Sequence, residues 1–244
     1  MNASTKPVAL ITGAARGIGR ECAIALARSG FHLVLTDLEQ DLPAELGAVC
    51  VSGDITDLAL HPKLVQAAMD QWGRLDCLVN NAGVGVLRRG DLLDVSPESF
   101  DRCLSVNTRA VFFLSQAVAR HMLRHIAPDE HHRSIINITS SNAVAVSIAR
   151  GEYCVSKCAS SMTTKLFALR LAEAGVGVYE VRPGVIETSM TAPVKALYDS
   201  LIEDGLVPMK RAGATPPMSP PQSLPWPKAV CRTPWARLSR WMAA

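Results

Sequence analysis

A glycine-rich turn placed directly after a short apolar strand constrains the fold of this chain more than any other feature. Residues 8–11 are Val-Ala-Leu-Ile, and they run into the turn Thr12-Gly13-Ala-Ala-Arg16-Gly17-Ile18-Gly19. An amphipathic segment over residues 20–28 follows and predicts a helix. Glycines let a backbone approach a pyrophosphate, whose charge the free N–H groups at a helix start stabilise. An isolated glycine cluster is often only a turn, but this position between strand and helix indicates a nucleotide site.

The second predicted strand ends at the residue that selects the nucleotide. Residues 31–36 are Phe-His-Leu-Val-Leu-Thr, and Asp37 follows them, about twenty residues beyond the glycines. A carboxylate at this place accepts hydrogen bonds from both ribose hydroxyls and repels a 2′-phosphate, so we expect NAD rather than NADP. Two alternatives stay open, because Asp37 also suits a turn or a helix N-cap and Arg16 would tolerate a phosphate.

Strands and helices alternate as far as residue 181. Apolar runs predict further strands at residues 48–51, 75–79, 135–138 and 176–181, and helical periodicity covers residues 61–72, 100–124 and 153–173. This alternation predicts an α/β fold, a doubly wound parallel sheet of Rossmann-like type flanked by helices on both faces. Ligands of such sheets bind beyond the carboxyl ends of the strands.

A tyrosine and a lysine four residues apart mark the candidate chemistry. Tyr153 and Lys157 share one face of a predicted helix, and a nearby positive charge lowers a tyrosine pKa from its usual value of about 10. We expect this pair to exchange protons near neutral pH. Ser140 lies thirteen residues upstream, where a buried strand ends, and Ser141 is its alternative. Alone, a Tyr-x-x-x-Lys pair is weak evidence, since helices contain such pairs by chance.

Taken together, these motifs resemble those of the short-chain dehydrogenase/reductase family. The matching elements follow the family's order and spacing: the glycine turn, Asn80-Asn81-Ala82-Gly83, Asn107, Ser140, Tyr153-x-x-x-Lys157 and Pro183-Gly184. The 3-oxoacyl reductase-like subgroup is the most similar, judged from residues 136–138, 183–188 and 205–211. The resemblance implies an NAD(P)-dependent oxidoreductase that interconverts a secondary alcohol and a ketone. A 3-oxoacyl thioester, a steroid, a sugar and a polyol are all candidate substrates.

The resemblance also implies a role for each matched position. Tyr153 would be the general acid/base, and Lys157 would lower its pKa and hold the nicotinamide ribose. Ser140 would hydrogen-bond the substrate oxygen, and Asn107 would anchor a water that links Lys157 to solvent. The cofactor-binding residues would be Thr12, Gly13, Arg16, Gly17, Ile18, Gly19, Asp37, Asp54, Ile55, Asn81, Ala82, Gly83, Tyr153, Lys157, Pro183, Gly184, Ile186 and Thr188.

Composition and charge argue against several other classes of protein. No apolar run approaches the roughly eighteen residues of a membrane span, and residues 1–6 show no signal-peptide pattern. Seven scattered cysteines without a Cys-x-x-Cys spacing favour reduced thiols, so we expect a cytoplasmic protein that binds no membrane. The charge distribution does not indicate a nucleic-acid partner. The histidines at positions 121, 125, 131 and 132 suit an exposed polar region better than a metal site.

The two long predicted helices bear on the oligomeric state. Residues 100–124 and 153–173 carry more apolar surface than one face of a sheet would cover. In the family that this chain resembles, these helices pack between subunits. We therefore expect a homodimer or a homotetramer, with packing inside a single core as the alternative.

The C-terminal segment departs from the rest of the sequence at residue 214. Residues 214–244 contain seven prolines, three of the four tryptophans, no glycine and no acid, and the chain beyond Asp204 carries a charge of +6. We divide the chain into a catalytic NAD(P)-binding domain, residues 1–213, and a Pro-rich basic tail, residues 214–244. The family's seventh strand is expected to be absent or altered. Translation in a shifted reading frame is one hypothesis and a genuine interaction tail is the other; a catalytically silent nucleotide-binding protein is the alternative function.

Overall fold

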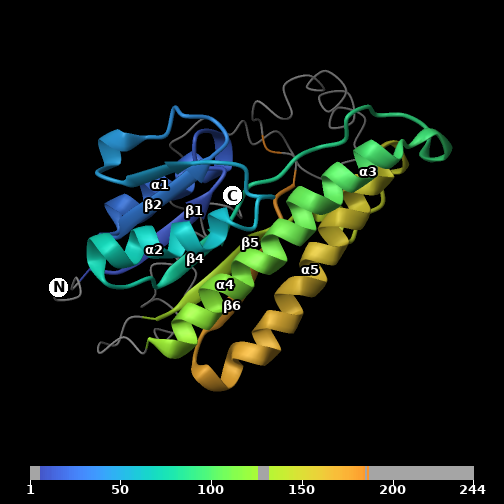
Figure 1. Cartoon of the computed structure of the whole chain (residues 1–244). Coiled ribbons are helices and arrows are strands. Elements are labelled where there is room, and N and C mark those ends of the chain that lie inside the picture. The colour runs from blue at the N-terminus through green and yellow to red at the C-terminus, as the bar shows by residue number, and fades with distance from the viewer. Residues whose placement is uncertain (1–5, 126–131, 185, 187–244) are drawn as a thin grey trace, which may run out of the picture. The chain divides into compact units, whose positions relative to one another are not determined.

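In the computed structural model, six parallel strands form one sheet (Figure 1). The order of the strands in space is β3-β2-β1-β4-β5-β6, so the chain first winds one way from β1 and then the other way from β4. The strands are β1 (Val8–Thr12), β2 (His32–Asp37), β3 (Val49–Ser52), β4 (Cys77–Asn80), β5 (Ser134–Ile138) and β6 (Gly177–Val181). The predicted α/β fold with a doubly wound parallel sheet is confirmed.

The structure describes residues 6–125, 132–184 and 186. Residues up to Arg182 form one compact unit and residues from Pro183 onward belong to another, so each unit is described by itself. The sheet, its helices and all elements named below belong to the first unit.

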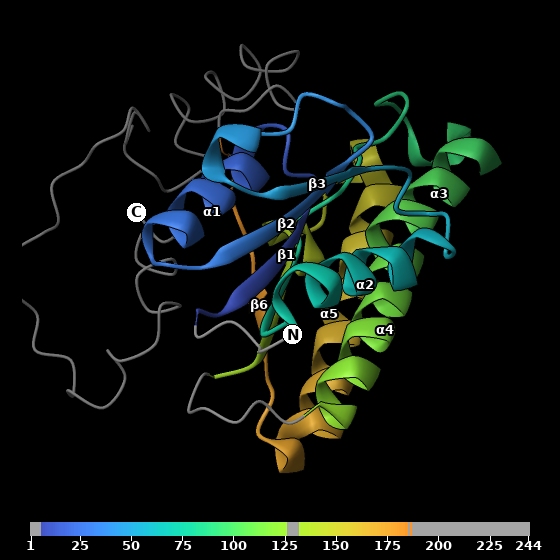
Figure 2. The ribbon, with the colours of Figure 1, turned by 60° about the vertical axis from the view of Figure 1, so that its left-hand side comes forward.

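Helices cover both faces of the sheet. Figure 2 shows α1 (Gly17–Arg28) on one face, and α2 (Leu60–Trp72), α4 (Val111–Arg124) and α5 (Gly151–Leu171) on the other. Every residue of β1 and β5 is buried, as expected for parallel strands that are covered on both sides. Within the described residues, no helix combines the length and the apolar character needed to cross a membrane.

The helix predicted over residues 100–124 is interrupted by a wider turn. Helix α3 (Pro97–Leu104) begins directly after Ser96, whose side chain caps the helix by accepting a hydrogen bond from the Ser99 N–H. A π-helical segment, Ser105–Ala110, then joins α3 to α4. Single π turns inside α-helices are rare overall, but those that occur are often found at functional sites. This one contains Asn107.

Strand β6 is the last strand of the sheet in the described part of the chain. Its five residues are all half-buried, whereas the five residues of the neighbouring β5 are all buried. The predicted change at the seventh strand and the tail, residues 214–244, lie outside the described residues. These two predictions therefore stay predictions.

Candidate active site

The point where the sheet reverses its winding lies between β1 and β4, and two side chains tie these strands together there. The Thr12 hydroxyl oxygen accepts hydrogen bonds from the backbone N–H groups of Asn81, at 3.0 Å, and Ala82, at 2.9 Å. In return, the Asn81 side-chain amide donates to the carbonyl oxygens of Thr12 and Gly13, at 3.0 and 2.9 Å. Nucleotides bind at this switch point in doubly wound sheets.

The glycine turn fits a pyrophosphate group. Gly13 has a φ of +65°, a conformation that suits glycine. A Cβ atom on Gly19 would lie 2.0 Å from the Gly13 carbonyl oxygen, so only glycine allows the first turn of α1 to lie this close to the loop. No side chain caps α1, and its first turn contains no acidic residue. The N–H groups at this helix start thus meet no competing carboxylate from their own helix, which suits an anionic ligand.

Asp37 and Arg16 have separate partners at the end of β2. The Asp37 carboxylate accepts a hydrogen bond from the Ala15 N–H at 3.0 Å, which fixes it against the glycine turn. Arg16 instead forms an exposed ion pair with Glu39 at 2.9 Å. Ile18, the second residue of α1, is half-buried. The carboxylate predicted to face the ribose is therefore held beside the loop, and the arginine that would tolerate a phosphate is already paired.

Asp54 and Ile55 follow β3. The exposed Asp54 carboxylate accepts hydrogen bonds from the N–H and the hydroxyl of Thr56, both at 2.8 Å. Ile55 packs against the core, and its carbonyl oxygen lies 2.8 Å from His61 Nε2. Gly53 N–H donates to the Asp37 carbonyl oxygen at 2.9 Å, which joins the ends of β2 and β3.

Asn107, Gly83 and Lys157 converge beyond β4. Asn107 is fully buried, and its side-chain amide donates to the Val84 carbonyl oxygen and to Ser156 Oγ, both at 2.9 Å. Its Oδ1 accepts a hydrogen bond from the Val84 N–H at 2.8 Å. A Cβ on Gly83 would lie 3.2 Å from Asn107 Oδ1 and 3.3 Å from Lys157 Nζ. Residues from three segments thus meet where the family resemblance predicted a common site.

Lys157 is a buried cation beside the ring of Tyr153. Only 5% of its surface is exposed, and Nζ donates to the Ile138 carbonyl oxygen at 3.1 Å. Nζ lies 5.8 Å from the centroid of the Tyr153 ring. Burial lowers the Lys157 pKa from 10.5 to about 8, and the neighbouring Cys103 thiol opposes this shift. The amine is therefore able to change its charge just above neutral pH.

Ser140 lies between β5 and a short 3₁₀ turn, η4 (Ser141–Ala143), that packs against α5. Its side chain is buried, and its Oγ accepts a hydrogen bond from the Asn142 N–H at 3.1 Å. Ser141, the alternative, is the first residue of this turn and is half-buried. Ser140, Tyr153, Lys157 and Asn107 all belong to the first unit.

Two residues at this site were not predicted from the sequence. Ser156 Oγ donates to the Tyr153 carbonyl oxygen at 2.8 Å while it accepts the bond from Asn107, so it connects the π turn to α5. Arg150 directly precedes α5, and its guanidinium carbon lies 5.4 Å from the centroid of the Tyr153 ring. Ser156 lies three positions after Tyr153 on α5, and this helical spacing was the signal available in the sequence, whereas Arg150 lies outside the helix and had no such signal.

Four predicted cofactor-binding residues lie beyond the first unit. Pro183, Gly184 and Ile186 are described and follow β6 in the sequence, but they belong to the second unit. Thr188 lies outside the described residues. Their predicted contacts with a nicotinamide stay predictions.

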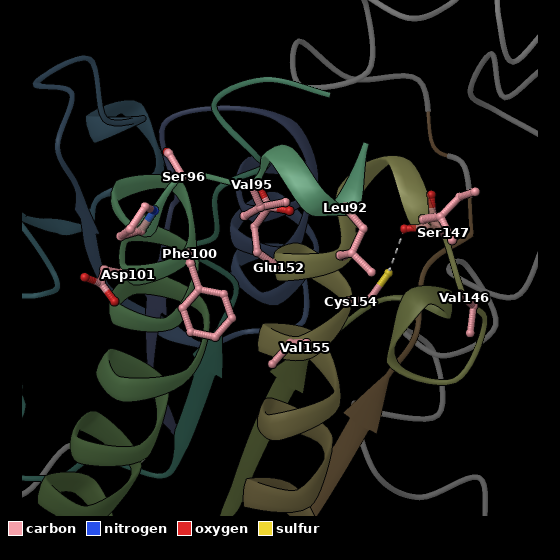
Figure 3. Close-up of a pocket in the computed structure, with 13 residues that line it drawn as sticks. Leu92, Val95, Ser96, Phe100, Asp101, Val146, Ser147, Glu152, Cys154 and Val155 are labelled. Atoms are coloured by element: carbon pink, nitrogen blue, oxygen red, sulfur yellow. Dashed lines mark hydrogen bonds between the residues drawn. The ribbon is translucent and has the colours of Figure 1, made fainter. Parts of the chain in front are cut away.

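An apolar pocket of about 660 Å³ opens between α3 and the start of α5 (Figure 3). Its walls also come from η2 (Leu92–Asp94) and residues 146–148, and they include Cys154, whose thiol donates to the Ser147 carbonyl oxygen at 3.7 Å. Neither Ser140 nor Tyr153 lines this pocket.

Comparison with known proteins identifies the family. A family model described as short chain dehydrogenase matches residues 7–198. The chain is 33% identical over 199 residues to 2-dehydro-3-deoxy-D-gluconate 5-dehydrogenase of Dickeya dadantii, covering 79% of this chain and 76% of that protein. It is 32% identical over 206 residues to 3-oxoacyl-[acyl-carrier-protein] reductase of Synechocystis sp., covering 80% and 81%.

A solved structure supports the same identification. The crystal structure of a 3-oxoacyl-[acyl-carrier protein] reductase from Brucella melitensis in complex with NAD is 47% identical to this chain, with a TM-score of 0.78. The match covers 86% of this chain and 85% of that one. The resemblance predicted from the motifs is thereby confirmed. The chain belongs to the short-chain dehydrogenase/reductase family and is an NAD(P)-dependent oxidoreductase that interconverts alcohols and ketones.

Proposed function

We propose that Tyr153 is the general acid/base of this oxidoreductase, with Ser140, Lys157 and Asn107 as its partners. The observation that carries the proposal is the buried Lys157 ammonium, held 5.8 Å from the Tyr153 ring by the Ile138 carbonyl oxygen. A positive charge at this range favours the phenolate form of tyrosine. A tyrosine beside such a cation is suited to give and take a proton near neutral pH.

In carbonyl reduction, the Tyr153 hydroxyl donates its proton to the substrate oxygen, and Ser140 Oγ–H donates a hydrogen bond to the same oxygen. The nicotinamide ring, when bound, supplies the hydride to the carbonyl carbon. Lys157 stabilises the phenolate left on Tyr153. In alcohol oxidation the same phenolate takes the proton from the substrate hydroxyl.

Asn107 is proposed to take part in proton supply to Lys157. Both hydrogens of its side-chain amide are used by Val84 and Ser156, and Val84 N–H occupies one lone pair of Oδ1. A relay water would therefore bind at the second lone pair of Oδ1 or at the main-chain carbonyl of Asn107. The π turn that contains Asn107 supports this role, because such turns are frequent at functional sites.

We propose NAD(H) as the preferred cofactor. The Asp37 carboxylate is fixed beside the glycine turn, and Arg16 is paired with Glu39, so the local charges disfavour a 2′-phosphate. The similar reductase from Brucella melitensis is described in complex with NAD, which supports the same choice. Fluorescence titration of the whole chain with NADH and with NADPH tests the proposal. Equal affinity for the two, or tighter binding of NADPH, would contradict it.

A 3-oxoacyl thioester is our leading substrate class, because reductases of that substrate from Synechocystis and Brucella are similar to this chain. Activity against a panel of 3-oxoacyl thioesters, oxo acids, sugars and steroid ketones tests this choice.

Tyr153→Phe tests the proposed catalytic role of Tyr153. We expect turnover to fall by at least about a thousandfold while the NADH dissociation constant stays within about twofold of the wild-type value. Tyr179→Phe on β6 is the control, and retained turnover in Tyr153→Phe would refute the assignment.

We propose a homodimer or homotetramer as the assembled state. Four apolar side chains on α5 are exposed by 48% to 80%: Val155, Met162, Leu166 and Leu169. Their spacing puts them on one stripe of the helix, and Val155 also lines the apolar pocket of Figure 3. A continuous apolar surface of this kind supports contact with a second copy of the chain.

The division into a catalytic domain, residues 1–213, and a tail, residues 214–244, is also a proposal. Its support is the change in composition at residue 214. Resequencing the 3′ end of the gene in independent clones tests the shifted reading frame, and an uninterrupted frame would refute it.

We propose a cytoplasmic location, in agreement with the free thiols of the six described cysteines, and fractionation of cells tests it.

A further inference from the structure

Arg150 connects the segment that follows Ser140 to the ring of Tyr153. Its guanidinium donates to Asn142 Oδ1 at 2.5 Å and to Ser147 Oγ at 3.3 Å. The backbone N–H of the same Asn142 donates to Ser140 Oγ at 3.1 Å. At its other side, the guanidinium lies 5.4 Å from the centroid of the Tyr153 ring. One side chain thus contacts both segments that carry the proposed catalytic hydroxyls.

The charged groups around Tyr153 come from a few elements. Arg150 approaches the ring from the turn before α5, and Lys157 approaches it from within α5. Glu152 accepts a hydrogen bond from Ser99 Oγ of α3 at 2.7 Å, and it lines the apolar pocket together with Asp101 of α3. Helix α3 also carries the exposed Glu98 and Arg102, which donates to the Gly85 carbonyl oxygen at 2.9 Å. Its Cys103 thiol has a pKa that is raised by burial first and by Glu152 second, while Arg102 opposes the shift.

We propose that Arg150 is a positioning residue that aligns Ser140 with Tyr153 and that its permanent charge stabilises the Tyr153 phenolate alongside Lys157. This inference rests on the proposed roles of Tyr153 and Ser140. A guanidinium suits the task because its planar fork makes two hydrogen bonds in fixed directions while its face lies against an aromatic ring. It also keeps its charge at every working pH, whereas burial brings the Lys157 pKa to about 8. At alkaline pH, Arg150 is therefore the more constant of the two cations.

The test is an ultraviolet difference titration of tyrosinate on the whole chain, which needs no substrate. The chain has three tyrosines, so the Tyr153 signal is the difference between a protein and its own Tyr153→Phe variant. In Arg150→Gln we expect the Tyr153 titration midpoint to rise by about half to one pH unit, because a nearby cation is lost. Arg150→Lys keeps the charge and should restore most of the midpoint. Arg88→Gln removes an exposed arginine of the loop after β4 and should leave it unchanged.

Steady-state kinetics supply the second readout. With a substrate from the carbonyl panel, Arg150→Gln should lower kcat by about ten- to a hundredfold with little change in the KM for NADH. The pH profile of alcohol oxidation should shift to higher pH, in parallel with the Tyr153 titration midpoint. Arg150→Lys should recover the pH profile but not all of kcat, since it lacks the planar fork.

Three outcomes would overturn the inference. The first is a Tyr153 midpoint in Arg150→Gln that equals the wild-type midpoint. The second is an unchanged kcat and pH profile with only a lower melting temperature, which would make Arg150 merely structural. The third is an equal upward shift in Arg88→Gln. Retained turnover in Tyr153→Phe would instead refute the proposed function, so the two failures are distinguishable.

Discussion

Replacing Lys157 with methionine should make the cofactor-free protein more stable while it removes activity. The Lys157 side chain is 5% exposed, and burial lowers its pKa from 10.5 to about 8. At pH 7 this difference means that the buried charge destabilises the fold by about 3 kcal/mol. Methionine has a similar length and carries no charge. Loss of the hydrogen bond to the Ile138 carbonyl oxygen destabilises the variant by about 1 kcal/mol. We therefore expect the free energy of unfolding to rise by about 2 kcal/mol in total.

The pH dependence gives this prediction a distinctive signature. The folded-state pKa of Lys157 lies below its unfolded value, so the unfolded chain binds more protons between pH 8 and 10.5. In that window the wild-type protein therefore gains stability relative to the variant as the pH rises. The cost of the buried charge should fall from about 3 kcal/mol at pH 7 to about half of that at pH 9.5.

Urea unfolding of the whole chain without cofactor, at pH 7 and pH 9.5 and at two protein concentrations, measures this effect. With an m value of about 2 kcal/mol per molar, a gain of about 2 kcal/mol moves the midpoint upward by about 1 M at pH 7. Lys165→Met is the control, because Lys165 is an exposed lysine of the same helix. A Lys157→Met protein that is less stable than the wild type, or a difference that does not change with pH, would refute the reasoning.

Three further predictions address other parts of the structure. In fluorescence titration, Asp37→Ala should lower the ratio of the NADPH to the NADH dissociation constant at least tenfold. Asp41→Ala, at an exposed site nearby, should leave this ratio unchanged. Burial lowers the pKa of His121 to about 4, so stability should fall by about 2 kcal/mol from pH 8 to pH 5 and His121→Phe should remove most of that fall in urea unfolding. Leu169→Glu places a charge on a residue that is 80% exposed, and it should shift the mass measured by light scattering toward the monomer without changing the melting temperature of the monomer by more than a few degrees. An unchanged mass would leave the stripe on α5 without a role in assembly.

The strands and the glycine turn could be predicted because their causes are local. An apolar run followed by Thr12 and Gly13 has few alternatives to a strand that ends in a tight turn, and the observed β1 ends at Thr12. The family resemblance, rather than any local pattern, implied that Asn107 and Lys157 would share a site, and both lie within 3.3 Å of a Cβ position on Gly83.

The π turn could not be predicted, because the residues to which its Asn107 side chain is hydrogen-bonded are distant in sequence. The apolar periodicity over residues 100–124 indicated one helix, and the structure has a π turn at Ser105–Ala110. The Asn107 side chain in this turn bonds to Val84 and Ser156, which are 23 and 49 positions away. Arg150 escaped prediction for a related reason: its contacts depend on two short 3₁₀ turns, η4 and η5 (Ile148–Arg150), which leave no periodic pattern.

Three buried side-chain oxygens in the described part of the chain lack a hydrogen-bond partner, and each is close in sequence to a residue of the proposed site. They are Thr36 Oγ1, Glu152 Oε2 and Ser160 Oγ. Thr36 precedes Asp37, Glu152 precedes Tyr153, and Ser160 follows Lys157 by three positions on α5. Each unsatisfied polar group and each buried charge destabilises a fold, and sites where activity depends on such groups commonly give up stability. The stability gained in Lys157→Met is obtained only by removing the charge that Tyr153 needs, so no substitution at this position should improve both stability and activity.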